Sequence, residues 1–271
     1  MATVVCFHAH PDDESIATSG TMAKAKAEGH RVVLVIATRG EHGEVADGFL
    51  EPGEQLGLRR MTETFESARI IGVDRVEFLG YVDSGMMGEP TNDFPYCFWQ
   101  ADVDQAAHRL AAILREESAD VLTVYDDHGG YGHPDHINVN RVGVRAGQLV
   151  DGVRIFESTM NRDFLIRQIA EGRAAAEAAG LDAADFEGPD LEGEQADFGS
   201  AEELITHRID VAEFVALKRG SMIAHASQIP PESFFLQLPD EFFKSGFGTE
   251  WFIEHGQKRE PDAPFLTALW G

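Results

Sequence analysis

The chain has 271 residues, of which 43% are hydrophobic and 25% are charged, as in an ordinary globular protein. This length is enough for one large domain with a sizeable core, so neither a disulfide nor a structural metal is needed to hold the fold. The formal net charge of −25 argues against a nucleic acid or an anionic membrane as partner, because both require a basic surface.

The cysteines and the N-terminus favour a cytoplasmic protein. Cys6 lies in a predicted buried strand, which favours a free thiol over a disulfide. No apolar run approaches the roughly 18 residues that span a bilayer, and the N-terminus lacks the basic segment of a signal peptide. We therefore expect neither a membrane nor a nucleic acid as partner, and we leave a homo-oligomer open.

Short apolar or β-branched runs alternate with helix-length stretches through the first 160 residues. The expected strands are residues 4–8, 32–37, 76–80, 121–125 and 153–157, and the expected helices are residues 14–28, 55–71, 103–117 and 135–150. Gly29 and Gly72 follow the first two helices, where a C-terminal glycine is common. This alternation predicts an α/β fold with a Rossmann-like, doubly wound, mainly parallel sheet.

The regular alternation stops near residue 160. Residues 174–207 are rich in Asp and Glu and contain no Lys or Arg, so we expect a solvated loop in their middle. Residues 205–211 suit a further strand, residues 212–225 suit a helix, and the aromatic-rich tail at 234–252 is expected to pack over the site mouth or a neighbouring subunit. We thus expect a core at 1–160 and a C-terminal extension at 161–271 that packs on the core and covers the site.

Polar motifs follow four of the predicted strands. They are HPDDE at residues 10–14, TRGE at 38–41, YVDSG at 81–85 and DDHGGYGH at 126–133. In doubly wound sheets, ligands bind outside the carboxyl ends of the strands. The positions of the motifs therefore indicate one shared active site at that edge of the sheet.

The HPDDE run combines an imidazole with carboxylates in a stiff turn. Pro11 fixes one backbone dihedral, which helps to aim His10 and Asp13 at one point. Asp12 points elsewhere but stays within reach of a metal-bound water. The alternative is a turn in which Asp12 or Asp13 caps the following helix. A second His-rich loop further along the chain favours the metal site.

That second loop is GGYGHPDH at residues 129–136. Its glycines let the backbone approach a ligand, and Pro134 suits the first turn of a helix. His136 is the natural third metal ligand, His133 could project toward the bound water or the substrate carbonyl, and Asp135 could orient one of the two imidazoles. The alternative is a glycine turn with a surface histidine pair.

The ligand count indicates the metal. Two imidazoles and one carboxylate suit a catalytic Zn²⁺ site that keeps an open position for water. The same ligand set also accommodates Fe²⁺ in cells. No Gly-x-Gly-x-x-Gly fingerprint follows the first strand and no Gly-x-Ser-x-Gly elbow is present, so neither a dinucleotide enzyme nor a serine hydrolase is indicated.

Several single residues are weaker candidates, and each has a structural alternative. Arg60 and Glu63 lie one helical turn apart, as in an exposed ion pair. Asp83 suits either a sugar hydroxyl or a turn. The pair His225 and Gln228 could close the cleft or cap a helix. A further polar cluster resembles a second metal site, although we favour hydrogen bonding to the glycine turn for its members, Asp126, Asp127 and His128.

The two principal motifs, HPDDE at 10–14 and GHPDH at 132–136, resemble the zinc-dependent N-acetylglucosaminyl de-N-acetylases of the PIG-L/LmbE-like family. The wider runs HAHPDDES at 8–15, DSGM at 83–86 and GGYGHPDH look like its actinobacterial mycothiol branch. That branch contains a GlcNAc-inositol deacetylase and a mycothiol conjugate amidase. The resemblance covers roughly the first 150 residues and, more weakly, residues 225–228.

The resemblance implies which residues hold the metal and the substrate. It implies Asp12 as general base and zinc ligands at His10, Asp13 and His136. The residues that fall where the mycothiol enzymes hold substrate are Arg60, Asp83 and Met86, to which we add Gln228 at the end of the predicted helix.

The same resemblance implies roles for the second loop. Tyr131 and His133 would polarise the carbonyl or stabilise the oxyanion, and Asp135 would tune His133.

We therefore expect hydrolysis of an acetamide on an amino sugar, giving a free amine and acetate. One alternative is a mycothiol S-conjugate-type amidase that acts on a larger amide. A second is a non-catalytic sugar-binding protein with a vestigial metal. A third is a metal-dependent phosphodiesterase, in which residues 126–128 would help to hold a second metal.

Overall fold

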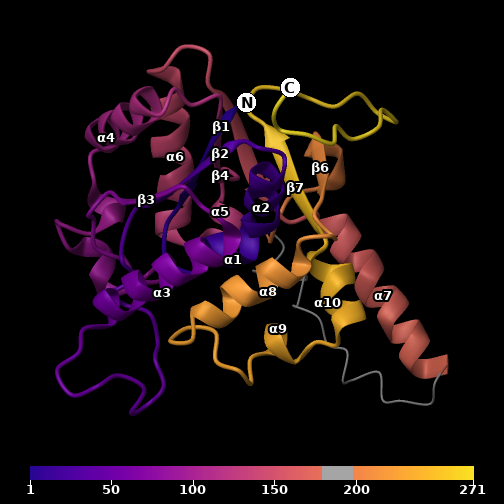
Figure 1. The fold of residues 1–271 in the computed structure, drawn as a ribbon, viewed down its shortest axis with the longest axis horizontal. Coiled ribbons are helices and arrows are strands. Elements are labelled where there is room, and N and C mark those ends of the chain that lie inside the picture. The colour runs from indigo at the N-terminus through magenta and orange to yellow at the C-terminus, as the bar shows by residue number, and fades with distance from the viewer. Residues whose placement is uncertain (179–197) are drawn as a thin grey trace.

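A seven-stranded sheet runs through the centre of the molecule, in the order β3-β2-β1-β4-β5-β7-β6 (Figure 1). The computed structural model describes residues 1–178 and 198–271. Neighbouring strands from β3 through β5 are parallel, whereas β7 is antiparallel to both β5 and β6. The strands are β1 (Thr3–His8), β2 (Arg31–Ile36), β3 (Arg75–Phe78), β4 (Val121–Tyr125), β5 (Arg154–Thr159), β6 (His207–Asp210) and β7 (Thr249–Glu254).

Helices cover both faces of this sheet, which confirms the predicted doubly wound α/β fold. They are α1 (Asp13–Ala17), α2 (Ser19–Ala27), α3 (Leu56–Ile71), α4 (Val103–Glu116), α5 (Gly129–Gly132), α6 (Pro134–Gln148), α7 (Arg162–Ala178), α8 (Val215–Ala224), α9 (Phe234–Gln237) and α10 (Asp240–Phe247). Among the described residues, no helix combines the length and the apolar character needed to cross a membrane.

Alternate residues of β1 contact the two helical layers. Phe7 belongs to the cluster that includes Leu110 of α4 and Val139 of α6. Its neighbour Cys6 belongs to the cluster on the other face, which includes Met22 of α2. Because both faces of a central parallel strand are buried, the strand is apolar at successive positions, as its sequence shows.

The predicted helix at 14–28 is in fact two helices, α1 and α2, separated at Thr18. Thr18 has φ −134° and ψ 2°, which is not a helical conformation, and its Oγ1 lies 2.8 Å from Nε2 of the buried His8. The hydroxyl thus satisfies a polar atom at the end of β1, and this contact accompanies the interruption of the helix.

The C-terminal extension differs from the prediction in several elements. Helix α7 was not predicted and reaches into the acidic stretch at 174–207, whose middle, residues 179–197, lies outside the described residues. Strand β6 and helix α8 lie within the predicted segments at 205–211 and 212–225.

The aromatic tail packs on the core and forms part of it. It contains α9, α10 and β7, with Phe252 in the sheet core and Phe243 against Met222 and Ile229. The aromatic side chains thus fill a core where we expected a cover over the site mouth or a subunit contact. Strands β6 and β7 belong to the same sheet as the five strands of the first 160 residues. The division of the chain into a core at 1–160 and an extension at 161–271 therefore stays a prediction.

Candidate active site

The two sequence motifs converge at the carboxyl ends of β1 and β4, which are neighbours in the sheet. β1 leads through residues 9–12 into α1. β4 leads through a glycine turn into α6, with His133 just before that helix and His136 in its first turn. Adjacent parallel strands thereby bring together residues that lie more than a hundred positions apart in the chain.

His10, Asp13 and His136 lie together, as the sequence predicts. Asp13 has one carboxylate oxygen 3.3 Å from His10 Nδ1 and the other 3.4 Å from His136 Nε2. The Nε2 atom of His136 is buried and has no hydrogen-bond partner among the described residues. An unpaired imidazole nitrogen beside a carboxylate fits a divalent metal.

Two overlapping groups bring potential ligand atoms within 4.8 Å of one another. One joins His10 to His133 and His136, and the other joins His10 to Asp83 and Asp135. All of these residues are buried. The site therefore contains more potential metal-ligand atoms than the three predicted ligands supply.

Asp135 contacts a different imidazole from the one expected. Its carboxylate lies 3.2 Å from His10 Nε2 and accepts a hydrogen bond of 2.9 Å from the Ser84 backbone and another from the Ser84 hydroxyl. His133 receives only the backbone N–H of Asp135, at 3.1 Å from its Nδ1. The hydrogen bonds from Ser84 hold the Asp135 carboxylate toward the loop after β3. In that position the carboxylate orients His10 and not His133.

Burial and charge set the protonation of the site. Burial lowers the pKa of His10, but Asp83, Asp13 and Asp135 outweigh it, so the pKa lies well above the ordinary value. Burial, with His10 and His136 nearby, lowers the pKa of His133 to about 2, so that ring is neutral.

Asp12 has a backbone conformation that residues other than glycine rarely adopt. Its φ is 102°, and its carboxylate, 18% exposed, lies 3.3 Å from Arg60 Nη2. Burial raises its pKa to about 6, although Arg60 acts in the opposite direction. Strained backbones of this kind cluster at functional sites.

Arg60 supports the HPDDE loop. It is buried, and it donates to the carbonyl oxygens of Pro11 (2.5 Å) and Gly40 (2.8 Å). Glu63 instead accepts hydrogen bonds from Ser227. The two residues therefore have separate partners, and the simple surface ion pair between them is wrong.

The remaining predicted substrate residues and the predicted catalytic Tyr131 lie around this cluster at different depths. Asp83 is buried with its Oδ1 3.4 Å from His10 Nε2, whereas Met86 and Tyr131 are 46% and 53% exposed. The Tyr131 ring lies 5.0 Å from that of His136. Gln228 donates from Nε2 to the Glu44 carbonyl at 3.1 Å. Their contacts with a substrate stay predictions.

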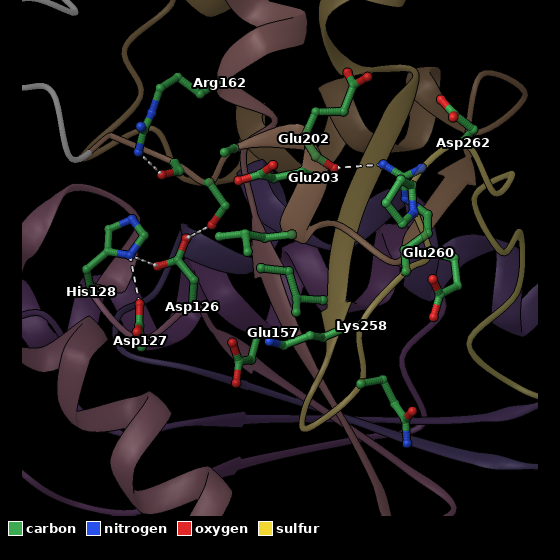
Figure 2. A pocket seen from close by; sticks show the side chains of 18 residues that line it. Asp126, Asp127, His128, Glu157, Arg162, Glu202, Glu203, Lys258, Glu260 and Asp262 are labelled. Atoms are coloured by element: carbon green, nitrogen blue, oxygen red, sulfur yellow. Dashed lines mark hydrogen bonds and ion pairs between the residues drawn. The ribbon is translucent and has the colours of Figure 1, made fainter.

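Within the cluster at residues 126–128, the Asp126 side chain supports the glycine turn, as we favoured, whereas those of Asp127 and His128 contact each other. Asp126 accepts a 2.6 Å hydrogen bond from the Gly130 N–H and another from the Thr159 hydroxyl. His128 lies 3.0 Å from Asp127. These residues line a separate cavity of about 980 Å³ whose other walls come from Glu157, Arg162, Ile253 and residues 199–204 and 257–262 (Figure 2).

Four supporting residues were not predicted as part of the site: His8, Glu14, Ser84 and Tyr125. Tyr125 stacks on His136 with ring centroids 4.2 Å apart, and its hydroxyl lies 2.9 Å from His8. Ser84 holds Asp135, and Glu14 contacts the backbone of Asp12. Glu14, Ser84 and His8 lie within the motifs HPDDE, YVDSG and HAHPDDES, although no role was predicted for them; Tyr125 lies in a predicted strand and carried no such signal.

The comparison with known families agrees with this geometry. The PIG-L family model, described as GlcNAc-PI de-N-acetylase, matches residues 5–147. The chain belongs to the PIG-L family. The matched region contains both histidine motifs, so the resemblance expected from them is confirmed. As a PIG-L protein, the chain is an N-deacetylase, an enzyme that hydrolyses an amide bond.

Curated relatives extend the similarity over nearly the whole chain. The protein of Acidothermus cellulolyticus named 1D-myo-inositol 2-acetamido-2-deoxy-alpha-D-glucopyranoside deacetylase is 41% identical over 93% of this chain and 88% of its own length. The protein of the same name from Thermobifida fusca is 40% identical over 96% of both chains.

Solved structures share the fold of this PIG-L protein. N,N'-diacetylchitobiose deacetylase from Pyrococcus horikoshii matches with a TM-score of 0.56 and 22% identity, covering 93% of this chain and 83% of its own. The conserved protein TT1542 from Thermus thermophilus matches with a TM-score of 0.57 and 19% identity, covering 97% of this chain and 100% of its own. At these identities the similarity shows the fold alone.

Proposed function

We propose that the chain is a zinc-dependent deacetylase of GlcNAc-inositol, which it hydrolyses to acetate and the free amine. The observation that carries this proposal is the cluster of His10, Asp13 and His136 beside Asp12, in which both imidazoles are buried. The substrate is inferred from curated relatives that carry its name and match more than nine-tenths of the chain.

In this proposal His10, Asp13 and His136 hold the metal. Bound there, zinc supplies the Lewis acidity that activates water and polarises the amide carbonyl. One nitrogen of His10 lies beside Asp13 and the other beside Asp135. A carboxylate on the second nitrogen fixes the orientation of a metal-binding imidazole.

Asp12 is the general base. It directly precedes the ligand Asp13 in the same loop, and Arg60 on its other side restricts the carboxylate. It takes the proton of the attacking water as the new carbon–oxygen bond forms. Asp12 then returns this proton to the amine nitrogen, and the carbon–nitrogen bond breaks.

His133 and Tyr131 stabilise the negative charge that develops on the carbonyl oxygen. Because His133 Nδ1 accepts the Asp135 N–H, the proton of the neutral ring is on Nε2, which is a hydrogen-bond donor. Burial raises the pKa of the Tyr131 hydroxyl, so it also keeps its proton. Donors aimed at a developing oxyanion lower the barrier of acyl transfer.

The test is acetate release from synthetic GlcNAc-inositol by purified protein, followed with the metal content of the same sample. We expect chelation to abolish release and one equivalent of zinc to restore it. Full activity in a metal-free sample would refute the scheme. A mycothiol S-conjugate offered in competition separates deacetylase from amidase, since preferential cleavage of the conjugate would overturn the proposed substrate.

A further inference from the structure

We propose that Glu14 and His225 form a positioning pair that holds the backbone of Asp12 in its strained, base-presenting conformation. Glu14 belongs to α1, and His225 follows the last turn of α8 in the C-terminal extension. Helix α8 lies beside α1 and α3 (Figure 1). The inference rests on the proposed function, in which Asp12 is the general base.

Glu14 reaches back over the turn to the residue that it positions. Its Oε2 accepts the backbone N–H of Asp12 at 3.0 Å. The carbonyl of Asp12 is fixed from the other side, since it accepts the Ser15 hydroxyl at 2.7 Å and the Ser15 N–H at 2.9 Å. Both polar groups of the Asp12 backbone are thus restrained while its φ is 102°.

His225 fixes Glu14 in turn. The Oε1 atom of Glu14 lies 2.6 Å from His225 Nε2 and accepts the Ser67 hydroxyl at 2.6 Å. Both Glu14 and His225 are fully buried. Since a carboxylate accepts hydrogen bonds, Nε2 is the donor, and His225 Nδ1 has no partner among the described residues. The imidazole therefore directs its one satisfied nitrogen at Glu14.

Helix capping does not account for these contacts. The backbone N–H of His225 already makes the capping bond, to the Met222 carbonyl. Its side chain instead contacts Glu14 of α1, the helix that begins directly after Asp12. The same segment has a second tether, since Ser227 donates from its N–H and hydroxyl to Glu63 of α3 at 2.9 and 2.6 Å. The two tethers reach different elements, so their effects are separable.

The test compares His225→Ala, His225→Gln and the matched control Ser227→Ala. Each variant is measured for kcat and KM on GlcNAc-inositol, zinc content and melting temperature. We expect His225→Ala to lower kcat about 10- to 100-fold at unchanged zinc content and KM, because misplacement of a catalytic group by about 1 Å has effects of this size. In His225→Gln the amide can donate to Glu14, so we expect this variant to recover most of the kcat that His225→Ala loses.

Ser227→Ala removes the hydroxyl bond to Glu63 from the second tether, keeps the backbone N–H bond, and does not touch Glu14. It lowers the melting temperature but leaves kcat within about twofold of the parent, since no residue of the reacting centre moves. A merely structural role for His225 predicts the opposite pattern, in which His225→Ala and Ser227→Ala lose kcat together and in step with stability. That pattern, or an unchanged kcat in folded His225→Ala, overturns the proposal.

Two further measurements cover other outcomes. Should His225→Ala fail to fold, the near-isosteric Glu14→Gln serves, because its amide cannot accept from Asp12, Ser67 and His225 together; an unchanged kcat there overturns the proposal. Should the unmodified chain release no acetate, the proposed function fails instead. In that case a crystal structure of His225→Ala or Glu14→Gln tests the Glu14–His225 pair. The proposal requires that Asp12 no longer has a positive φ in that structure.

Discussion

The backbone of Asp12 is the clearest sign, at the scale of one residue, that this loop is built for chemistry. Positive φ at a residue with a Cβ raises the free energy of the folded state by about 1–3 kcal/mol. Arg60, Glu14 and Ser15 together hold this conformation. The strain is thus sustained by several side chains, each of which makes a hydrogen bond or ion pair to residues 11–12.

This strain can be measured as stability. Asp12→Gly tolerates φ at 102° without a Cβ, whereas Asp12→Ala does not. We expect the Gly variant to be more stable than the Ala variant by about 1 kcal/mol in urea unfolding, although glycine usually destabilises a folded chain. A more stable Ala variant would show that the backbone is relaxed in solution.

Metal binding and turnover should separate at neighbouring positions of the site. Asp12→Asn keeps the shape of the base but not its basicity, so we expect a loss of about 10²- to 10⁴-fold in kcat with zinc retained. His136→Ala removes a proposed ligand and should lose the metal itself. Elemental analysis beside acetate release distinguishes the two, and loss of zinc from Asp12→Asn would instead make Asp12 a ligand.

The sequence predicted which residues meet but not how each side chain turns. Two strand-end motifs suffice to place His10, Asp13 and His136 together, because the strand order of a doubly wound sheet brings them there. The choice of Asp135 between His10 and His133 depends on Ser84, which lies within the YVDSG run but to which the sequence assigned no role. Local spacing therefore could not identify the imidazole that Asp135 orients.

At the scale of elements, α4 begins with a well-formed cap. The Asp102 side chain accepts the N–H of Gln105 at 2.9 Å. We expect Asp102→Ala to lower the free energy of unfolding by about 1 kcal/mol, since a helix N-terminus loses an acceptor. Asp102→Ser keeps an acceptor and should recover most of that loss in the same chemical denaturation series. Equal losses in both variants would rule out the capping effect.

The elements that the sequence predicted poorly lack a local signal. Helix α1 ends at Thr18, whose hydroxyl contacts His8, ten residues earlier in the chain. Strand β7 forms by pairing with the edge of β5. The sequence alone identified most of its residues only as part of an aromatic-rich tail. Pairing between distant segments decides such elements, whereas β1, β2 and β4 carry their own apolar pattern.

At the scale of the whole molecule, Glu117 joins segments at the amino ends of the strands. It accepts hydrogen bonds from Arg31, the first residue of β2, and Arg75, the first residue of β3. These bonds, led by that from Arg31, lower the pKa of Glu117 to about 2. A carboxylate with a depressed pKa stabilises the fold above its unfolded pKa, and this contribution is lost as the pH falls toward 2.

Glu117→Gln should therefore destabilise the protein by about 1 kcal/mol at pH 7, a value reduced for the partial exposure of the two arginines. The difference from the parent should shrink as the pH falls from about 5 toward 2, because the parent carboxylate becomes protonated as well. Urea unfolding at a series of pH values gives the comparison. A difference that stayed constant over this range would assign the effect to packing.

The place of β7 between β5 and β6 has a consequence for synthesis on the ribosome. The edge of β5 is complete once Thr159 has emerged, yet its partner, Thr249–Glu254, is translated some ninety residues later. Until then the nascent chain presents an open row of backbone donors and acceptors, the kind of surface that recruits foreign strands. A premature stop before Thr249 would make that interval permanent and leave a polypeptide prone to aggregation.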